Sequence, residues 1–337
     1  MTGSGPILGS LFLETLKKAG RVLVMGHSNP DGDSLGSCSA LALALESRGQ
    51  AVTLGYQGRI HSHLSFLAAG IKDCRPVSLS PGELADFDLM VMVDCLEADR
   101  IWENASDFSF LPPVLLIDHH PGRPEGWQPL AAYTSPLVSS SGELVFQVLE
   151  KLGTPLTRPI AEALLAALMS DTGFFSQNNV TSESFRQASI LVQAGARPEY
   201  LTGCLKRNWT QSRVRLLALA LGSVEMIFSG RVATMLLTQS MLEEAGAGLD
   251  DMDGFVEYPR SMSGAEAAAL FRIDGQGRTR VSLRSGLTLS VRELAEHFGG
   301  GGHQQAAAYT DPLPDPQAAR ERFKALAGRY LKLPGAE

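Results

Sequence analysis

The sequence predicts an α/β protein with two domains. Over the first ~200 residues, short apolar runs alternate with helix-like stretches, which is typical of a mainly parallel sheet flanked by helices. Further along the chain, strand-like runs are spaced for hairpins, which predicts a smaller α/β domain with a mixed sheet. The 337 residues leave room for a sizeable core in each domain.

The N-terminal domain is expected to alternate strands and helices. The predicted strands are residues 21–25, 51–54, 89–93 and 114–117. The predicted helices are residues 35–48, 62–69, 159–168 and 183–194, with one more from the capping box at 140–143 to residue 152. Because ligands of an open α/β sheet gather at the carboxyl ends of its strands, we expect His27, Asp94 and Asp118 to lie together.

The pattern changes near residue 195. We predict a first domain at 1–197, a helical linker at 198–209 and a second domain at 210–337. The second domain is expected to begin with a helix at 210–221. Two hairpins follow, formed by residues 224–228 with 232–237 and by residues 267–273 with 279–284, and a helix-like stretch spans 291–298.

Composition restricts the class of partner. The net charge of −7 disfavours a protein that coats long duplex nucleic acid, because phosphate contacts dominate such affinity, but it is compatible with a short anionic substrate. No apolar run reaches the ~18–20 residues of a membrane span, so no membrane partner is expected. Four scattered cysteines without a C-x-x-C pair, and a first segment unlike a secretory signal, predict a cytoplasmic protein.

One turn concentrates metal-binding side chains. His27, Asp31 and Asp33 lie between a predicted strand and a predicted helix. Pro30 and Gly32 favour a tight turn there. Two carboxylates this close repel one another unless a cation neutralises them. The alternative is a polar turn with a helix-capping aspartate, but the density of ligands favours a metal site.

Further candidates follow other apolar runs. Asp94 ends one run, Asp118 with His119 and His120 ends another, and Asp171 follows the predicted helix at 159–168. Alone, each aspartate could be a turn residue or a helix cap, and the two histidines an exposed polar pair. Together with the first turn, they form a set of carboxylates and imidazoles at converging strand ends.

This set of residue types points to divalent ions and phosphoryl chemistry. Carboxylate mixed with imidazole suits Mn²⁺ or Mg²⁺ more than a structural zinc site. Two such ions ~3.5–4 Å apart can clamp a phosphoryl group and lower the pKa of a bridging water. Asp94 is the candidate to touch both ions, and Asp118 could fix the tautomer of an imidazole.

A glycine run marks the second domain. Gly299, Gly300, Gly301 and Gly302 precede His303. Such a run can be a flexible loop, or it can expose backbone N–H groups to an anion. The presence of Arg284 and Ser285, which can bind phosphate oxygens, favours the second interpretation. Arg260 and Arg272 are further cations that we interpret as structural or surface residues, and core packing is favoured over base stacking for Phe255 and Tyr258.

The four motifs together resemble those of the DHH phosphoesterase superfamily. This resemblance implies that one ion is held by His27, Asp31 and Asp94, and the other by Asp33, Asp94, His119 and Asp171. It also implies that His120 faces the substrate phosphate. The glycine–histidine segment resembles the substrate-binding DHHA1 domain, with Ala308 standing where that family more often has glycine. The implied substrate-binding residues are Arg284, Ser285, Gly300, Gly301, Gly302 and His303.

Over the whole chain, the sequence is similar to the bifunctional oligoribonuclease and pAp phosphatase branch of this superfamily. That resemblance implies hydrolysis of short oligoribonucleotides to mononucleotides, dephosphorylation of 3′-phosphoadenosine 5′-phosphate (pAp) to AMP, or both. It also implies two divalent ions, Mn²⁺ or Mg²⁺, and a homodimer. The alternatives are a phosphodiesterase acting on cyclic di-AMP or pApA, a nucleotide sensor without catalysis and an RNA-binding module, of which the acidic charge disfavours the last.

Overall fold

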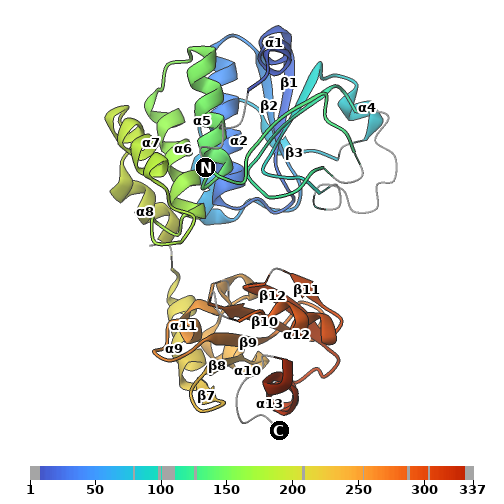
Figure 1. Ribbon diagram of the computed structural model, residues 1–337, viewed down its shortest axis with the longest axis vertical. Coiled ribbons are helices and arrows are strands. Elements are labelled where there is room, and N and C mark those ends of the chain that lie inside the picture. Colours follow the sequence, from blue (N-terminus) through green and yellow to red (C-terminus); the bar gives the residue numbers. More distant parts are fainter. Residues whose placement is uncertain are drawn as a thin grey trace, which may run out of the picture. The chain divides into compact units, whose positions relative to one another are not determined.

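The computed structural model describes residues 8–78, 80–97, 100, 111–124, 127–206, 209–252, 254–286, 289–302 and 304–330. The chain divides into two compact units, Met1–Asn208 and Trp209–Glu337. Each unit contains one six-stranded sheet, so the predicted α/β class is confirmed. Figure 1 shows the elements of both units.

The sheet of the first unit is parallel throughout. Its strand order is β3-β2-β1-β4-β5-β6. The strands are β1 (Arg21–Met25), β2 (Ala51–Tyr56), β3 (Cys74–Pro76), β4 (Leu89–Val93), β5 (Val114–Asp118) and β6 (Ala131–Thr134). All carboxyl ends therefore meet at one edge of the sheet, as the sequence predicts.

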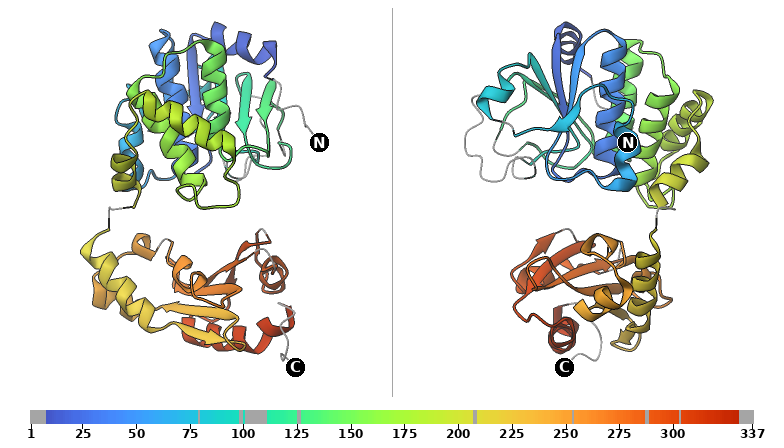
Figure 2. Two further views of the ribbon diagram at one scale, coloured as in Figure 1. Left: turned by 60° about the vertical axis from the view of Figure 1, so that its left-hand side comes forward. Right: turned by 180° about the vertical axis from the view of Figure 1, so that it is seen from behind.

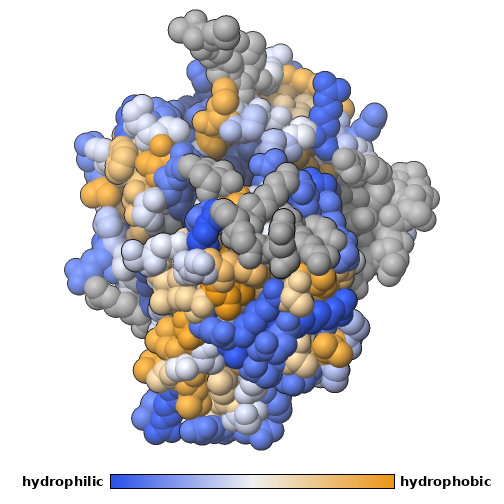
Figure 3. Space-filling view, turned by 60° about the horizontal axis from the view of Figure 1, so that its bottom comes forward, coloured by the Kyte–Doolittle hydropathy of each residue, from blue (hydrophilic) through white to orange (hydrophobic). Residues whose placement is uncertain are grey.

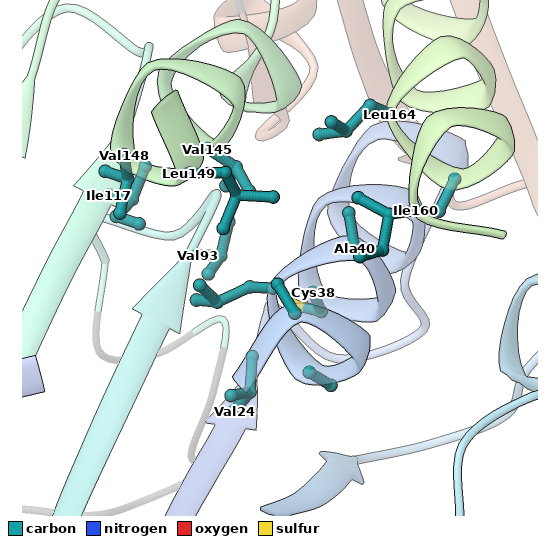
Figure 4. Close-up of a cluster of buried hydrophobic side chains, with 14 of the residues drawn as sticks. Val24, Cys38, Ala40, Val93, Ile117, Val145, Val148, Leu149, Ile160 and Leu164 are labelled. Atoms are coloured by element: carbon teal, nitrogen blue, oxygen red, sulfur yellow. The ribbon is translucent and has the colours of Figure 1, made fainter. Parts of the chain in front are cut away.

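Helices cover both faces of this sheet, but unequally (Figures 1 and 2). The helices are α1 (Ser10–Lys18), α2 (Gly32–Ser47), η1 (Ser62–Leu64), α3 (Ser65–Ala68), α4 (Pro81–Leu84), α5 (Ser141–Leu152), α6 (Arg158–Asp171), α7 (Ser182–Gln193) and α8 (Pro198–Lys206). Helices α2, α5 and α6 form the main layer on one face. Figure 4 shows their core, where Ile117 of β5 lies beside Val148 of α5 and Val24 of β1 lies toward Cys38 of α2.

The opposite face is also apolar. Leu23, Met90 and Leu116, which alternate with the residues of the first face, belong to a second cluster that includes Leu84 of α4. Burial on both faces explains why these strands are continuous apolar runs.

Helix α2 lies unusually close to α6, and this closeness positions the ends of both helices. A Cβ atom at Gly36 would lie 2.7 Å from the carbonyl oxygen of Ala163, so only glycine fits there. The first turn of α2 and the last turn of α6 are thereby held side by side.

Several boundaries differ from the sequence predictions, three of them near the candidate site or between the domains. Helix α2 begins at Gly32 with Asp31 as its N-cap, because the Asp31 carboxylate accepts a hydrogen bond from the Ser34 backbone N–H. Helix α6 continues to Asp171 instead of ending at 168. The predicted linker at 198–209 contains α8, which lies within the first unit. The short edge strands β3 and β6 were not predicted from the sequence.

The sheet of the second unit is mixed, with the order β11-β12-β10-β9-β8-β7 and one parallel pair, β8 with β9. Its strands are β7 (Glu225–Ile227), β8 (Val232–Leu237), β9 (Ala267–Ile273), β10 (Thr279–Ser285), β11 (Gly301–Gly302) and β12 (Ala306–Asp311). Its helices are α9 (Gln211–Gly222), α10 (Gln239–Ala245), η3 (Leu249–Met252), α11 (Glu257–Arg260), α12 (Arg292–His297) and α13 (Pro316–Tyr330). Both predicted hairpins, β7–β8 and β9–β10, are present.

Different helices pack on the two faces of this sheet. Helices α12 and α13 pack on the face that carries Phe271, Val281 and Leu283. On the other face, α9 and α10 pack near β8 and β9, where Leu270 is buried. This second core contains residues of β8 and β9 but none of β10 or β12. On the same side of the sheet, β10 and β12 line a cavity that is described below.

The surface mixes hydrophilic and hydrophobic residues on the face that Figure 3 presents. Large exposed apolar side chains include Leu137, Phe185 and Val214. Among the helices of the described residues, none combines the length and apolar character that crossing a bilayer requires.

Candidate metal centre

The candidate metal ligands lie at or near the ends of three adjacent strands and two helices. His27 follows β1 by two residues, Asp94 directly follows β4, and Asp118 is the last residue of β5. Asp31 and Asp33 lie at the start of α2, and Asp171 ends α6. Parallel pairing of β1, β4 and β5 brings the first three to the same edge, where the close packing of α2 on α6 adds the others.

The side chains form two groups around Asp94. In the first group, His27 Nε2 lies 3.9 Å from Asp31 Oδ2 and 3.7 Å from Asp94 Oδ2. In the second, His119 Nε2 lies 3.7 Å from Asp33 Oδ2, 3.6 Å from Asp94 Oδ1 and 3.5 Å from Asp171 Oδ2.

Asp94 is common to both groups through different oxygens. Its Oδ2 faces His27, and its Oδ1 faces His119 and also lies 3.6 Å from His120 Nδ1. Ligand atoms of His27, Asp31 and Asp94 lie within 4.8 Å of one another, as do those of Asp33, His119 and Asp171. This is the geometry expected of a carboxylate that bridges two ions.

The start of α5 fixes two of these carboxylates. The backbone N–H groups of Ser141 and Gly142 donate to Asp33 at 2.7 and 3.1 Å, and the Ser141 hydroxyl donates to Asp94 Oδ1 at 2.9 Å. Sequence reasoning missed these positioning contacts, although the Ser-Ser-Gly segment before an apolar helix was their signal. The predicted capping box is half formed, because the Glu143 carboxylate accepts from the Ser139 N–H instead of from that of Ser140.

Asp94 has an unusual backbone. Its φ of 63° lies in the left-handed region, which costs a non-glycine residue roughly 1–2 kcal/mol. Its N–H donates to the Ile117 carbonyl at 2.9 Å, so the pairing of β4 with β5 holds the residue in place. Strain of this kind is typical of functional residues that the surrounding structure over-determines.

Burial and mutual repulsion raise the pKa values of the carboxyls. The pKa of Asp33 is raised well above its usual value by burial and by Asp171 and Asp31. That of Asp94 is raised in the same way by burial and by Asp33. Burial and Asp31 raise the pKa of Asp171 to about 6. A divalent cation at this position would remove the cause of the repulsion.

The histidines have different protonation behaviour. Burial lowers the pKa of His119 to about 4 and also lowers that of His27, so both are neutral at pH 7, as metal ligands must be. The pKa of His120 is raised, because its Nδ1 lies 2.9 Å from Asp118 Oδ1. Asp118 Oδ1 also accepts the His120 backbone N–H at 2.7 Å, which fixes the orientation of this imidazole.

The donor set fits hard divalent ions. The grouped atoms are carboxylate oxygens and imidazole nitrogens, which suit Mn²⁺ or Mg²⁺. Two buried cysteines lie nearby, but burial raises the pKa of Cys38 well above its usual value and that of Cys95 to about 12. Both thiols therefore stay protonated and are poor ligands.

The second unit contains a cavity of about 470 Å³ beside β10, lined in part by Met252 of η3 and Glu257 of α11. It brings together the predicted Arg284, Gly301 and Gly302. It is also lined by polar residues that were not predicted as substrate-binding, namely Arg272, Arg280, Ser282 and Glu257. The sequence signal for Arg280 and Ser282 was their period-two spacing with Arg284, which places the three side chains on one face of the strand.

Other predicted residues of the second unit lie elsewhere. Ser285 is buried, and its hydroxyl donates to the Leu289 carbonyl at 2.7 Å, so it stabilises the loop and does not line the cavity. Gly300 packs against β12, where a Cβ atom would lie 2.2 Å from the Ala308 carbonyl oxygen. His303 lies outside the described residues. Phe255 is fully buried, as the core-packing interpretation requires.

Comparison with known proteins identifies both parts of the chain. The model of the DHH family N-terminal domain matches residues 21–168, and the DHHA1 domain model matches residues 231–332. The chain is 31% identical to the bifunctional oligoribonuclease and PAP phosphatase NrnA of Thermus thermophilus, over 93% of this chain and 91% of that protein. The chain belongs to the DHH–DHHA1 phosphoesterase family.

This DHH–DHHA1 protein is also similar to a second sequence relative and to a solved structure. It is 27% identical to the cyclic-di-AMP phosphodiesterase GdpP of Bacillus subtilis over 97% of its own length, but it spans only half of GdpP. Its fold is similar to that of an exopolyphosphatase-related protein from Bacteroides fragilis, with a TM-score of 0.85, 24% identity and coverage of 94% of this chain and 96% of that one.

Proposed function

We propose that the chain is a metal-dependent phosphoesterase that hydrolyses short oligoribonucleotides to mononucleotides and removes the 3′-phosphate of pAp. The observation that carries this proposal is Asp94, whose two carboxylate oxygens face two separate groups of ligands. The likeness to the Thermus thermophilus oligoribonuclease and PAP phosphatase over nearly the whole chain supports the substrate class.

The residues divide between two ion sites in this proposal. His27, Asp31 and Asp94 would hold one ion, and Asp33, Asp94, His119 and Asp171 would hold the other. Mn²⁺ is the proposed ion because imidazole and carboxylate are both present. When bound, two such ions would neutralise phosphoryl oxygens and lower the pKa of a water nucleophile.

The residues of the chain then orient the phosphate and move protons. Asp118 holds Nδ1 of His120, which leaves Nε2 of this ring available to donate a hydrogen bond to a phosphate oxygen. The raised pKa of His120 favours the protonated ring that such donation uses. Asp33 remains fixed by the N–H groups of Ser141 and Gly142, so the ligands need little rearrangement.

The second domain would hold the remaining nucleotide. Arg284 offers a guanidinium fork, and the exposed Gly301 and Gly302 of the edge strand β11 offer backbone N–H groups to the same cavity. Ser282 takes the place in the cavity that the sequence assigned to Ser285. His303, next to Gly302 in the chain, stays a predicted contact.

The experiment is an activity screen with Mn²⁺ on pAp, di- to pentaribonucleotides, cyclic di-AMP and pyrophosphate. We expect release of AMP from pAp and of mononucleotides from the oligoribonucleotides. Turnover of none of these substrates would contradict the proposal, and binding without turnover would favour a nucleotide sensor. Preference for pyrophosphate would refute the assignment of the second domain.

A second candidate activity is hydrolysis of cyclic di-AMP or pApA. The likeness to GdpP over 97% of this chain favours it, although this chain spans only half of that protein. The same screen separates the two candidates through the ratio of kcat/KM for cyclic di-AMP to that for pAp.

Two further proposals concern the setting of the enzyme. The four free cysteines of the described residues suit the reducing cytoplasm. A homodimer without affinity for long duplexes is proposed from the family resemblance and the acidic charge. Light scattering in solution tests the dimer, and a gel-shift assay tests the duplex.

A further inference from the structure

The cavity of the second unit contains one side chain whose charge opposes an anionic ligand. The other charged residues that line it in the described part of the chain are Arg272, Arg280 and Arg284, all hydrogen-bond donors that suit phosphate. Glu257 lies among them and contributes the carboxylate of the lining. A carboxylate accepts hydrogen bonds and repels phosphate, so its presence calls for a hydroxyl or amino group on the ligand.

Glu257 is held so that one oxygen remains for the cavity. Its Oε2 accepts from Arg260 Nη1 at 2.8 Å, within the same short helix α11, and Arg260 does not line the cavity. Its Oε1 lies 3.5 Å from Arg284 Nε, beyond a good hydrogen bond. Arg260 therefore orients the carboxylate, and Oε1 keeps acceptor capacity beside the guanidinium that would bind phosphate.

The separation of these groups matches a nucleotide. A phosphate on Arg284 carries its ribose within a few ångströms, which is the distance at which Glu257 lies. Acidic side chains recognise ribose hydroxyls next to a bound phosphate in dinucleotide-binding folds. Within an RNA chain the 3′-oxygen is esterified, so the 2′-OH is the free donor, and it is the group that distinguishes RNA from DNA.

We propose that Glu257 is a specificity-determining residue that accepts a hydrogen bond from the ribose 2′-OH of the nucleotide whose phosphate binds Arg284. This inference rests on the proposed function and deepens it, because it names the feature by which the cavity selects ribonucleotides. In the competing explanation, Glu257 only balances the charge of Arg284, and its removal would change binding of RNA and DNA equally.

The test compares Glu257→Ala and Glu257→Gln with the wild-type full chain loaded with Mn²⁺. The measured quantity is the kcat/KM of the diribonucleotide pApA divided by that of its deoxyribose counterpart. A charge-assisted hydrogen bond predicts that Glu257→Ala lowers this ratio by about tenfold. Glu257→Gln keeps an oxygen acceptor without the charge, so it should give an intermediate ratio.

The matched control is Glu296→Ala, which removes a carboxylate from another intrahelical arginine pair of the same domain, outside the cavity. It should leave the ratio unchanged. An equal effect of Glu257→Ala on both substrates, or equal ratios for the alanine and glutamine variants, would overturn the inference.

A binding measurement separates this inference from the proposed function. Calorimetric titration of the metal-free chain with pAp and with 2′-deoxy-pAp, in both of which the 3′-oxygen is esterified, should show tighter binding of pAp, and Glu257→Ala should abolish the difference. If the wild type hydrolyses neither dinucleotide, the proposed function fails while this measurement still decides the inference. If the wild type binds both nucleotides equally, the inference fails.

Discussion

The metal centre of the first unit and the cavity of the second differ in the sign of their charge. In the first unit, buried carboxylates repel one another, and burial raises the pKa of Asp33 and Asp94. In the second, arginines line a cavity on a sheet face. The first site suits a cation and the second an anion, so we propose that chemistry and recognition are built on separate domains.

The two sites also use different parts of a sheet. The metal centre lies at the carboxyl ends of parallel strands, where residues far apart in sequence converge. The cavity lies on the face of antiparallel strands, where alternate residues of β10 point the same way. Loss of one metal ligand should therefore stop the reaction, whereas loss of one cavity residue should weaken binding by degrees.

The largest expected effect is that of Asp94→Asn. Loss of the bridging charge should lower kcat for pAp by about 10³-fold, because both proposed ion sites use Asp94. Steady-state kinetics with Mn²⁺ would measure this. Asp86→Asn, which neutralises a surface carboxylate 3.6 Å from Arg21, serves as control and should retain activity. Full turnover by the Asp94 variant would show that the centre does not depend on a bridging carboxylate.

The next prediction concerns stability and compares Gly300, which precedes β11, with Gly301, the first residue of β11. Gly300→Ala should destabilise the chain by about 2–3 kcal/mol, because the added Cβ meets the backbone of β12 at 2.2 Å. Gly301→Ala meets nothing within 4 Å and should change the free energy of unfolding by less than about 0.5 kcal/mol. Denaturant unfolding of both variants measures the difference, and equal stabilities would contradict the close packing of β11 on β12.

A smaller effect is expected for Arg284→Ala. It should raise KM about tenfold with a lesser change in kcat, because the guanidinium is proposed to bind a phosphate that is not cleaved. Arg278→Ala is the matched control, since Arg278 pairs with Asp274 in the turn of the same hairpin and does not line the cavity. An unchanged KM for Arg284→Ala would exclude this contact.

The smallest expected effect is the pH dependence of the stabilisation by Mn²⁺. In the metal-free protein, Asp171 with its pKa raised to about 6 keeps a proton that the unfolded chain loses above about pH 4, so its contribution to stability falls from pH 4 to 6. His119, with its pKa lowered to about 4, acts in the opposite direction, because the unfolded imidazole binds a proton below about pH 6.5. The two trends partly offset each other.

Bound Mn²⁺ would remove the carboxyl trend, since ligands must be deprotonated. The rise in Tm on adding Mn²⁺ should therefore grow by roughly 5 °C between pH 5 and pH 7. Thermal unfolding with and without Mn²⁺ measures it, and Asp94→Asn should reduce the rise at both pH values. A rise independent of pH would mean that the ion does not displace protons from these carboxyls.

The sequence predicted most strands of the first sheet and β7 to β10 of the second because their patterns are strong, but it did not predict α10, β12 or α13. The strands β1, β4 and β5 are continuous apolar runs, and β9 and β10 flank a glycine-containing turn. The edge strands β3 and β6 are short and only partly buried, so their residues carry little hydrophobic pattern.

The sequence named the carboxylates and imidazoles that the structure brings together, but not the contacts that hold them. The residue types of His27, Asp94 and Asp171, and their positions after apolar runs, indicate metal binding. The contacts from Ser141 to Asp33 and Asp94 instead depend on tertiary packing, which no local pattern reveals. Glu257 was passed over for a related reason. An exposed glutamate on a short helix has no local pattern, and only the packing of α11 against β9 and β10 places it beside Arg284.

The left-handed backbone of Asp94 has a practical consequence for stability engineering. Asparagine tolerates this conformation well among non-glycine residues and carries no charge, whereas burial and Asp33 raise the pKa of the Asp94 carboxyl. The Asp94→Asn chain should therefore be more stable without metal than the wild type, although we expect its turnover to be about 10³-fold slower. Such a variant would be a trap that holds an uncut oligonucleotide long enough for the complex to be crystallised.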